Sequence, residues 1–472
     1  MMKREERNLS LIDLDIKSLK GVTQDSRKVK DGYLFAAFQG DFVDGYDYIS
    51  DAIARGASVI LSDRDVQISG NARLLLVDNP RKVFSYIVAE FYQNQPEHIV
   101  AVTGTNGKSS FVHFVNQLWH ALGKKGAFIG TGSGAMTTPD PVSLHEALNE
   151  FYQNKVTNIA IEASSHGLDQ YRIDGVHVAV AAFTSFSQDH LDYHGNMDDY
   201  FTAKSRLFSE ILKQGGTAVL NADIPRYKAL LEICKVRGIK VLSYGKNGTD
   251  IKLISNIVKS ASQQIEIEVM GEDYSIELPL VGGFQVMNVL CALACVISQY
   301  PEKTAELITA LSKLEGVTGR MQHVGSSNIY VDYAHTPDAL ENALKSLRLH
   351  TDARIICVFG CGGDRDKSKR RLMGEVASRI ADIVIVTDDN PRSENPADIR
   401  KKILSGVDNH NSNIHEIADR REAIKFAISQ MDKNDILLVA GKGHEQGQIF
   451  DGLVEPFDDV KEVEAAMARL NN

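Results

Sequence analysis

A short glycine-rich segment constrains this chain more than any other feature of its sequence. Gly104-Thr105-Asn106-Gly107-Lys108-Ser109 follows an apolar run at 99–102, typical of a buried strand, and precedes a stretch with the apolar spacing of a helix. In this order the glycines let backbone N–H groups approach phosphates, the lysine supplies a charge and the serine hydroxyl can sit on Mg²⁺. The alternative is a glycine turn that ends a strand. Because Lys-Ser and the helix start are in register, the segment predicts a nucleotide-phosphate loop.

Composition narrows the classes of protein to which this chain can belong. Its 472 residues suffice for about three domains, and 43% hydrophobic residues can fill several cores. A net charge of −10 disfavours general binding to nucleic acid or membrane surfaces, which both require positive fields. No apolar run approaches the ~20 residues of a membrane span, and residues 1–7 are too polar for a secretory signal. We therefore expect a soluble cytoplasmic protein.

The cysteines predict a reducing environment rather than a disulfide or zinc framework. The chain has 5 cysteines, an odd number, and no pair has the spacing of a zinc site. Cys291 and Cys295 are one helical turn apart on an expected core face. We expect reduced structural thiols in apolar surroundings, at Cys234, Cys291, Cys295, Cys357 and Cys361.

Apolar runs that alternate with helical stretches predict an α/β protein of three domains. Residues 1–96 form a small α/β unit, which ends at the linker-like pair Gln95-Pro96. Residues 97–319 carry the phosphate loop on a mostly parallel sheet, which ends in a hairpin at 265–278 and an apolar helix at 284–299. Residues 320–472 predict a doubly wound, Rossmann-like domain whose strand ends face a ligand crevice. Its expected strands are 329–331, 355–359, 383–386 and 436–439.

Two groups of polar residues follow expected strands of the central domain. Glu162 ends the strand at 159–161, where a carboxylate can hold the Mg²⁺ that bridges nucleotide phosphates. An acidic residue at a strand end is otherwise more often a solvated loop group. The second group, Asp-His-Leu-Asp-Tyr-His at 189–194, combines imidazole and carboxylate, which suit a divalent metal. Its alternative is a hydrogen-bonded loop that packs the next helix.

The C-terminal domain offers two arginines at one expected sheet edge. Arg365 belongs to the glycine loop 360–365, and Arg392 to the loop 388–392 after the next strand. Arginine forks recognise carboxylates in bidentate fashion. Alternatively, the two arginines pair with Asp364 and Asp389 as structural ion pairs. A further loop at 441–445 places Glu445 where it can bind an amine beside the arginines.

Together these segments resemble the Mur ligase family. The resemblance runs in order from Asp25-Ser26-Arg27 almost to the C-terminus, and its eight motifs have the family's spacing. Within the family, the chain is most similar to the member that adds the third amino acid of the peptide. The motifs are TGTNGKSS at 103–110, EASSHGLDQYR at 162–172, DHLDYH at 189–194, YFTAK at 200–204, DYAHTPD at 332–338, GCGGDRDK at 360–367, DNPR at 389–392 and GKGHE at 441–445.

This resemblance implies an activity and its substrates. The N-terminal domain would bind a UDP-sugar, the central domain ATP and the C-terminal domain an amino acid. ATP would phosphorylate the terminal carboxylate of UDP-N-acetylmuramoyl-L-alanyl-D-glutamate. The amine of an amino acid would then attack the acyl phosphate, which gives an amide, ADP and phosphate in cytoplasmic peptidoglycan precursor synthesis. The expected partners are these small molecules and Mg²⁺, with no nucleic acid, no membrane and a monomeric chain.

The resemblance also implies roles for individual residues. Lys108, Glu162, His190 and Lys204 would be catalytic, and Ser109, Glu162, His190 and Lys204 would surround the metal. Lys204 matches a lysine that the family carbamylates, whereas its sequence context alone predicts an exposed helix lysine. The ATP residues would be Gly104, Thr105, Asn106, Gly107, Lys108, Ser109, Ser110, Asn288, Arg320, Asp332 and His335. The muramoyl-peptide residues would be Ser26 (a uridine contact), Thr137, Thr138, Ser164, Gln170 and Arg172. The amino-acid residues would be Arg365, Asp389, Asn390, Pro391, Arg392, Gly441 and Glu445.

The DNPR segment bears on which amino acid is added. It resembles the version of the family that takes meso-diaminopimelate, whose second carboxylate Arg392 can fork. The alternatives are the same reaction with L-lysine, or a ligase similar to folylpolyglutamate synthase. The latter would not require an extra N-terminal domain of about a hundred residues. A kinase would release a stable phosphorylated product, and a non-catalytic scaffold would not require Glu162, His190 and Lys204 together.

Overall fold

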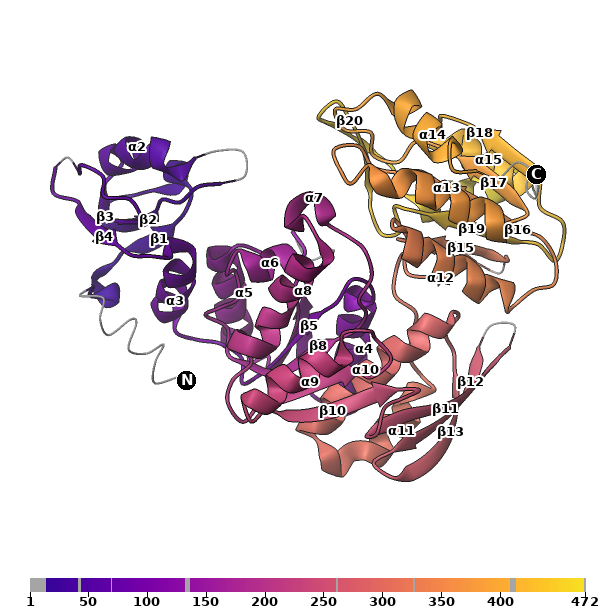
Figure 1. Ribbon diagram of the computed structural model, residues 1–472, viewed down its shortest axis with the longest axis horizontal. Helices are drawn as coiled ribbons and strands as arrows, with labels where there is room; N and C mark the ends of the chain where they lie inside the picture. The colour runs from indigo at the N-terminus through magenta and orange to yellow at the C-terminus, as the bar shows by residue number, and fades with distance from the viewer. Residues whose placement is uncertain are drawn as a thin grey trace.

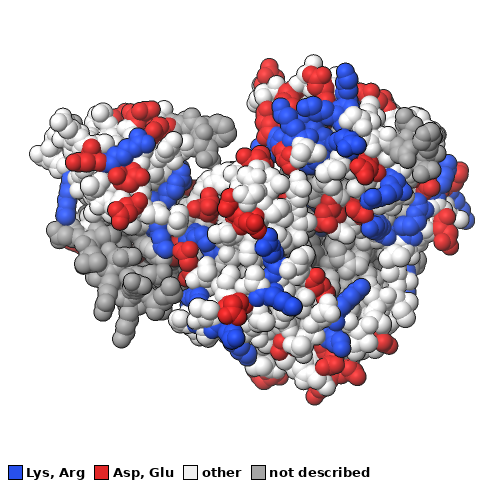
Figure 2. All heavy atoms as spheres, in the orientation of Figure 1, with Lys and Arg blue, Asp and Glu red and all other residues white. Residues whose placement is uncertain are grey.

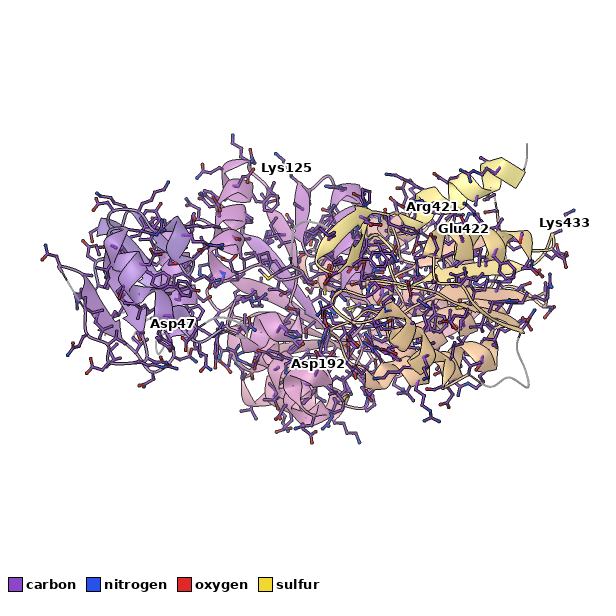
Figure 3. All side chains as sticks on the ribbon, turned by 90° about the horizontal axis from the view of Figure 1, so that it is seen from above. Asp47, Lys125, Asp192, Arg421, Glu422 and Lys433 are labelled. Carbon is purple, nitrogen blue, oxygen red and sulfur yellow. The ribbon has the colours of Figure 1, made fainter. Side chains whose placement is uncertain are left out.

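The chain consists of three lobes arranged in a row. The computed structural model describes residues 14–40, 44–68, 70–131, 136–259, 262–325, 327–407 and 413–470. The polar start at 1–7 therefore lies outside the described residues. The central lobe stands between the N-terminal and C-terminal lobes (Figure 1). Seen from above, Asp47 lies on the N-terminal lobe, Asp192 on the central lobe and Lys433 toward the far end of the C-terminal lobe (Figure 3).

The N-terminal lobe is built on a small parallel sheet. Its four strands have the order β1-β2-β3-β4, and every neighbouring pair is parallel. The α/β character expected for this part of the chain is confirmed: β2, β3 and β4 fall on apolar runs of the sequence, whereas the three-residue β1 is too short for a periodic signal. The elements are η1 (Ile16–Ser18), β1 (Gly21–Thr23), η2 (Ser26–Lys28), β2 (Tyr33–Ala36), η3 (Gly45–Tyr48), α2 (Ile49–Ala54), β3 (Ala57–Ser62), β4 (Arg73–Leu76) and α3 (Pro80–Tyr92).

The central lobe contains a nine-stranded sheet of order β13-β12-β11-β10-β9-β8-β5-β7-β6. The strands from β6 to β11 are parallel, and β12 and β13 add an antiparallel hairpin, as the alternating sequence at 265–278 predicts. The strands are β5 (His98–Thr103), β6 (Gly126–Ile129), β7 (Asn158–Glu162), β8 (Val178–Phe183), β9 (Thr217–Asn221), β10 (Lys240–Gly245), β11 (Ile251–Val258), β12 (Gln263–Val269) and β13 (Glu272–Leu278).

Two apolar helices, α4 and α10, pack against one face of this sheet. Helix α4 buries Phe111, Phe114 and Trp119 completely, and it packs against α10, whose core-facing turn includes Cys291 and Cys295. The helices are α4 (Lys108–Ala121), α5 (Pro141–Gln153), α6 (Ser165–Asp169), α7 (Leu191–His194), α8 (Met197–Arg206), the π-helical turn η4 (Leu207–Ile211), α9 (Tyr227–Val236), α10 (Gly283–Gln299), η5 (Pro301–Lys303) and α11 (Thr304–Leu311). The predicted helix at 284–299 is therefore confirmed.

The C-terminal lobe contains a six-stranded sheet of order β14-β15-β19-β16-β17-β18. Only β14 is antiparallel, and the expected strands near 329, 355, 383 and 436 are confirmed as β15, β16, β17 and β19. The elements are β14 (Gln322–His323), β15 (Ile329–Asp332), α12 (Pro337–Arg348), β16 (Ile355–Phe359), α13 (Ser368–Ile380), β17 (Ile383–Val386), α14 (Pro396–Leu404), β18 (Asn413–Glu416), α15 (Arg420–Ser429), β19 (Ile436–Ala440), the hairpin β20 (Gly447–Phe450) and β21 (Leu453–Pro456), and α16 (Asp459–Leu470).

The cysteines agree with the sequence analysis. All five cysteines are buried and free, as expected for structural thiols. Among the described residues, no helix combines the length and apolar character that crossing a membrane requires.

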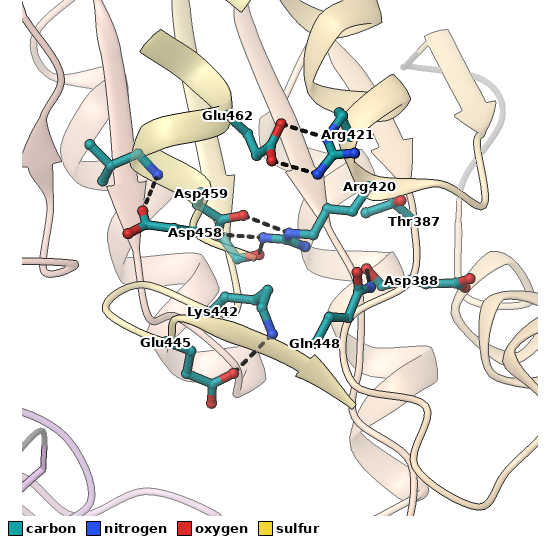
Figure 4. A network of polar contacts seen from close by, with 12 residues as sticks. Thr387, Asp388, Arg420, Arg421, Lys442, Glu445, Gln448, Asp458, Asp459 and Glu462 are labelled. Carbon is teal, nitrogen blue, oxygen red and sulfur yellow. Dashed lines mark hydrogen bonds and ion pairs between the residues drawn. The ribbon is translucent and has the colours of Figure 1, made fainter. Parts of the chain in front are cut away.

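Two adjacent arginines of α15 tie the last helix to the C-terminal sheet in different environments (Figure 4). Arg420 and Asp459 form an ion pair with both side chains fully buried, and Arg420 also donates to the carbonyl of Ala440 at the end of β19. Arg421 pairs with Glu462, but its side chain is 49% exposed. When one partner of a buried ion pair is removed, the other charge stays buried without compensation, which strongly destabilises the fold. Exposed ion pairs contribute little to stability.

We therefore predict that Arg420→Met destabilises the C-terminal lobe by about 3–5 kcal/mol, because the Asp459 carboxylate is left buried without its cation. The matched variant Arg421→Met should cost no more than about 1 kcal/mol. Urea unfolding followed by circular dichroism measures both values. Equal losses in the two variants would contradict this account of α16.

Candidate active site

One large cavity collects most of the residues that the sequence singles out. It has a volume of about 1160 Å³ and is lined by the central and C-terminal lobes. Figure 2 shows Lys and Arg gathered over the part of the C-terminal lobe that carries α13 and α14. Ser26 lies apart from this cavity, buried in the N-terminal lobe. The predicted residues in the lining are Thr105, Asn106, Gly107, Lys108, Ser109, Ser110, Thr137, Thr138, Glu162, Ser164, Gln170, Arg172, His190, Lys204, Asn288, Arg320, Asp332, His335, Arg365, Asp389, Asn390, Arg392, Gly441 and Glu445.

The phosphate loop joins β5 to α4, as the sequence predicts. Gly104 has a φ of +145°, and a Cβ built there would lie 2.0 Å from the Thr184 hydroxyl oxygen. Gly107 has a φ of +91°, and its Cβ would lie 2.3 Å from Asn288 Oδ1. Helix α4 begins at Lys108, so its free N–H groups and positive dipole end face the loop. The loop therefore has the backbone and the packing of an anion cradle.

Ser109 and Glu162 place hard oxygen ligands directly beside this loop. The Ser109 hydroxyl donates to Glu162 Oε2 over 3.3 Å and accepts from Arg320 Nη2 at 3.0 Å. Glu162 is 1% exposed, and its Oε1 accepts from the Thr131 backbone N–H at 2.9 Å. Glu162 is thus a buried group at the end of β7, and the alternative of a solvated loop carboxylate is wrong.

The Ser109 hydroxyl and the Glu162 carboxylate suit a Mg²⁺ ion that is partly bound by a substrate, rather than a metal ion that is bound by protein side chains alone. Among the described residues, no cluster of three or more His, Cys, Asp or Glu side chains is arranged to hold an ion by itself. Mg²⁺ is typically bound by one or two carboxylates together with water and substrate phosphates. The donors at Ser109 and Glu162 therefore suit a magnesium ion that arrives with a nucleotide.

The segment 189–194 places the imidazole of His190 on the cavity wall, beside that of His166. His190 has a φ of +53°, its Nε2 lies 3.3 Å from Asp189 Oδ2, and its ring packs edge-on against His166 with centroids 4.8 Å apart. Burial lowers the pKa of His190 to about 3, although the Asp189 carboxylate opposes the shift. His190 is therefore neutral near pH 7, with a ring nitrogen suited to metal binding.

Lys204 is the clearest correction to the sequence analysis. Its context predicts an exposed helix lysine, but the residue is only 1% exposed, on the buried face of α8. Its Nζ donates to the Gly104 carbonyl at 2.9 Å and lies 4.5 Å from the centroid of the Tyr200 ring. Burial and the nearby Lys108 charge lower the pKa of Lys204 well below its usual value. Helical position alone does not reveal this, because Gly104 and Lys108 come from a segment that is distant in the sequence.

The C-terminal lobe completes the nucleotide end of the cavity. Asp338, on the first turn of α12, accepts from Asn106 Nδ2 at 3.1 Å and from the Ser187 hydroxyl at 3.0 Å. The buried carboxylate of Asp332 accepts from the backbone N–H groups of Met321 and Ala334. Asp338 and Ser187 have no assigned role in the sequence analysis, although Asp338 closes the DYAHTPD segment that could have indicated it.

Apart from Ser26, the residues assigned to the muramoyl peptide line the cavity. The Thr138 hydroxyl donates to the carbonyl of Glu162 and accepts from the N–H of Ser164 at 2.9 Å. Arg172 donates to Gln170 Oε1 and to the Thr138 carbonyl. These contacts link the wall directly to the strand that carries Glu162.

The two arginines of the C-terminal lobe converge as predicted. A Cβ built on Gly362 would lie 2.8 Å from Arg392 Nη1 and 3.7 Å from Arg365 Cγ. Arg392 has a φ of +53° and donates from Nη1 to the carbonyl of Gly363 at 2.9 Å. Among the described residues, no ion pair joins either arginine to Asp364 or Asp389, so the structural-pair alternative is wrong. Both guanidinium groups therefore remain able to meet an anionic ligand.

The fold and this cavity define a phosphate-loop protein whose active site is built by two α/β lobes. Three family models match the chain, described as Mur ligase family, catalytic domain (residues 18–103), Mur ligase middle domain (102–296) and Mur ligase, glutamate ligase domain (319–443). The chain belongs to the Mur ligase family, which confirms the resemblance seen in the sequence.

Named relatives cover almost the whole chain. It is 45% identical to the UDP-N-acetylmuramoyl-L-alanyl-D-glutamate--2,6-diaminopimelate ligase of Agrobacterium fabrum, over 99% of this chain and 96% of the relative. The ligase of the same name from Brucella melitensis is 46% identical over 95% and 94%. A solved structure of a ligase with this name matches with a TM-score of 0.70 and 34% identity over 96% of both chains.

A more distant structural match bears on the rival interpretation. Folylpolyglutamate synthase from Mycobacterium tuberculosis matches with a TM-score of 0.64 and covers 82% of this chain, but at 18% identity. Such a match shows a shared fold alone.

The packing around Gly104 gives a test of the phosphate loop. We predict that Gly104→Ala destabilises the central lobe by roughly 2–5 kcal/mol and weakens nucleotide binding, since the new methyl group would overlap Thr184 at an unfavourable φ. Gly123 also has a positive φ, of +67°, but a Cβ there meets nothing within 4 Å. Gly123→Ala should therefore cost only about 1 kcal/mol. Thermal unfolding and calorimetric titration with ADP measure both effects, and equal behaviour of the two variants would contradict the assignment.

Proposed function

We propose that this chain is an ATP-dependent ligase that adds meso-diaminopimelate to UDP-N-acetylmuramoyl-L-alanyl-D-glutamate through an acyl phosphate. The observation that carries the proposal is that the phosphate loop and the two arginine loops line the same cavity. Phosphoryl transfer requires positioning and charge neutralisation more than a nucleophilic side chain. A cavity with cationic groups at both ends meets that requirement.

At the ATP end, each residue has a role that follows from its position. The N–H groups of the phosphate loop and the start of α4 would bind the phosphates, and Lys108 would neutralise charge during transfer. In the structure Lys108 Nζ donates to the carbonyls of Gly104 and Thr105, so it would turn from these to the nucleotide. Asn288, Arg320, Asp332 and His335 would surround the adenine, ribose and phosphates.

When bound with the nucleotide, Mg²⁺ would supply positive charge that offsets the charge developing on the phosphates. Ser109, Glu162 and His190 would hold it, together with a carbamate formed on Lys204. The lowered pKa of Lys204 supports this modification, because only the neutral amine can attack carbon dioxide. A carbamate also replaces a repelling ammonium by an anionic ligand.

The remaining substrates would occupy the other walls. Thr137, Thr138, Ser164, Gln170 and Arg172 would hold the muramoyl peptide with its carboxylate toward the phosphate loop. Ser26 would contact the uridine from the N-terminal lobe. On this proposal the chain acts in the cytoplasm as a monomer, and its domains (1–96, 97–319 and 320–472) bind the UDP-sugar, ATP and the amino acid in turn.

At the amino-acid end, Arg392 would fork the distal carboxylate of meso-diaminopimelate. Arg365, Asp389, Asn390, Pro391, Gly441 and Glu445 would complete this pocket. Desolvation lowers the pKa of Arg392, and the nearby Arg365 charge adds to the shift. A carboxylate placed between the two guanidinium groups would relieve their repulsion, which lysine, with its distal ammonium, would not do.

The first consequence concerns Lys108. Lys108→Ala should fold normally and lose ATP turnover by about 100-fold or more, because one preorganised charge can contribute several kcal/mol to the transition state. Release of phosphate in the presence of all three substrates measures the effect. Near-normal release by a folded variant would contradict the role of Lys108.

The second consequence concerns the added amino acid. An amide-formation assay with the dipeptide nucleotide should give a higher kcat/KM for meso-diaminopimelate than for L-lysine. Arg392→Ala should lower the value for meso-diaminopimelate by about 10- to 100-fold, since a charge-assisted pair is worth roughly 1.5–3 kcal/mol. A parent enzyme that prefers lysine, or a variant that keeps its full preference, would show that Arg392 does not select the substrate.

A further inference from the structure

A buried lysine joins the two loops that form the amino-acid end of the cavity. Lys442 follows β19 directly, in the GKGHE segment, and its side chain is fully buried. Its ammonium points across to the loop after β17 rather than to solvent, and Figure 4 shows it directed toward Glu445. A buried ammonium is costly unless it is well paired, so its partners indicate what it does.

The partners of Lys442 are two residues assigned to the amino-acid pocket. Lys442 Nζ donates to Asn390 Oδ1 at 2.9 Å and to Glu445 Oε2 at 3.0 Å. Asn390 Nδ2 in turn donates to the same Glu445 oxygen at 2.8 Å. The three side chains therefore close a small ring in which each contacts the other two.

This ring fixes which atoms face the cavity. Asn390 Oδ1 accepts a second bond from the Ile449 N–H at 3.0 Å, so this oxygen already has two partners. Glu445 Oε2 accepts from both Lys442 and Asn390, which leaves Oε1 as the atom available to a ligand amine. Asn390 and Glu445 line the cavity, whereas among the described residues Lys442 takes no part in its lining.

The backbone carries the same constraint to Arg392. Strand β20 bonds with the loop of Asn390 and Arg392, because the N–H of Arg392 donates to the Ile449 carbonyl at 3.0 Å and the N–H of Asp451 donates to the Arg392 carbonyl at 2.7 Å. The Asn390 amide links this edge to Lys442. Lys442 thus contacts Glu445 directly and reaches the loop of Arg392 through Asn390.

We propose that Lys442 is a positioning residue for the amino-acid substrate: it orients Glu445 and Asn390, and through them the Arg392 loop, without touching the substrate. This inference rests on the proposed function, and it adds a residue that affects binding of the amino acid. A positioning role predicts a split between kinetic constants. The KM for the amino acid should change, while the KM values for ATP and for the UDP-linked substrate should not.

The test compares Lys442→Met with Lys461→Met. Lys442→Met removes the charge and both bonds at nearly constant volume. Lys461 lies in the same lobe with its side chain 75% exposed, and its Nζ lies 3.7 Å from Asp458 Oδ2. We expect Lys442→Met to raise the KM for meso-diaminopimelate about tenfold or more, with the other two KM values within about twofold of the parent. Lys461→Met should match the parent in all three.

A double variant separates positioning from general damage. If Lys442 acts through Glu445, Lys442→Met and Glu445→Gln together should raise the KM by less than the product of their separate effects. Lys442→Gln, which keeps a donor without the charge, serves as the second variant should Lys442→Met not fold, and the same KM ratio applies to it.

The possible failures are distinct. A parent enzyme that adds no amino acid to the dipeptide nucleotide would overturn the proposed function and this inference together. A parent that adds meso-diaminopimelate, with an unchanged KM in the Lys442 variant, would overturn this inference alone. Equal rises in all three KM values, or multiplicative effects in the double variant, would also overturn it.

Discussion

Two lysine amines meet at one backbone carbonyl, and the active site depends on this arrangement. Lys108 Nζ and Lys204 Nζ each donate to the carbonyl of Gly104 at 2.9 Å, from α4 and α8. Burial lowers the pKa of both groups, and their mutual repulsion adds to the shifts at Lys204. Holding two positive charges side by side without water is unfavourable, and this cost favours the neutral form of Lys204 in the free protein. An anionic ligand at the phosphate loop offsets this repulsion, so the arrangement favours binding of a negatively charged substrate.

The same principle extends to the other end of the cavity. Burial lowers the pKa of Arg392 and the nearby Arg365 charge adds to the shift, while the carboxylates of Asp389 and Glu445 oppose it. The two ends belong to different lobes, and Asp338 joins these lobes through Asn106 and Ser187. Two such hydrogen bonds between lobes can break and re-form, which suits a site that must admit several substrates. The fold therefore sets two cationic regions opposite each other across one cavity.

Much of this arrangement could be predicted from the sequence, because the signals are local. The run at 99–102 and the Lys-Ser pair predict β5, the loop and α4, and the alternation at 265–278 predicts the β12–β13 hairpin. Strands β6, β10 and β11 carry weaker local signals and are missing from the predictions. Helical spacing places Tyr200 one turn from Lys204, but it could not predict the burial of Lys204, because Gly104 and Lys108 belong to a distant segment and meet it only in the folded chain. The role of Lys442 could not be predicted for the same reason, because its partner Asn390 is distant in sequence.

The most direct test of this account follows the reacting oxygen. If the cavity holds the carboxylate of D-glutamate against the terminal phosphate of ATP, that carboxylate becomes an acyl phosphate and loses one oxygen when the amine attacks. With an isotopically heavy carboxylate in UDP-N-acetylmuramoyl-L-alanyl-D-glutamate, mass spectrometry of the released phosphate should find one heavy oxygen in each phosphate formed with the amide. Phosphate without heavy oxygen, alongside normal amide formation, would contradict the proposed chemistry of the cavity.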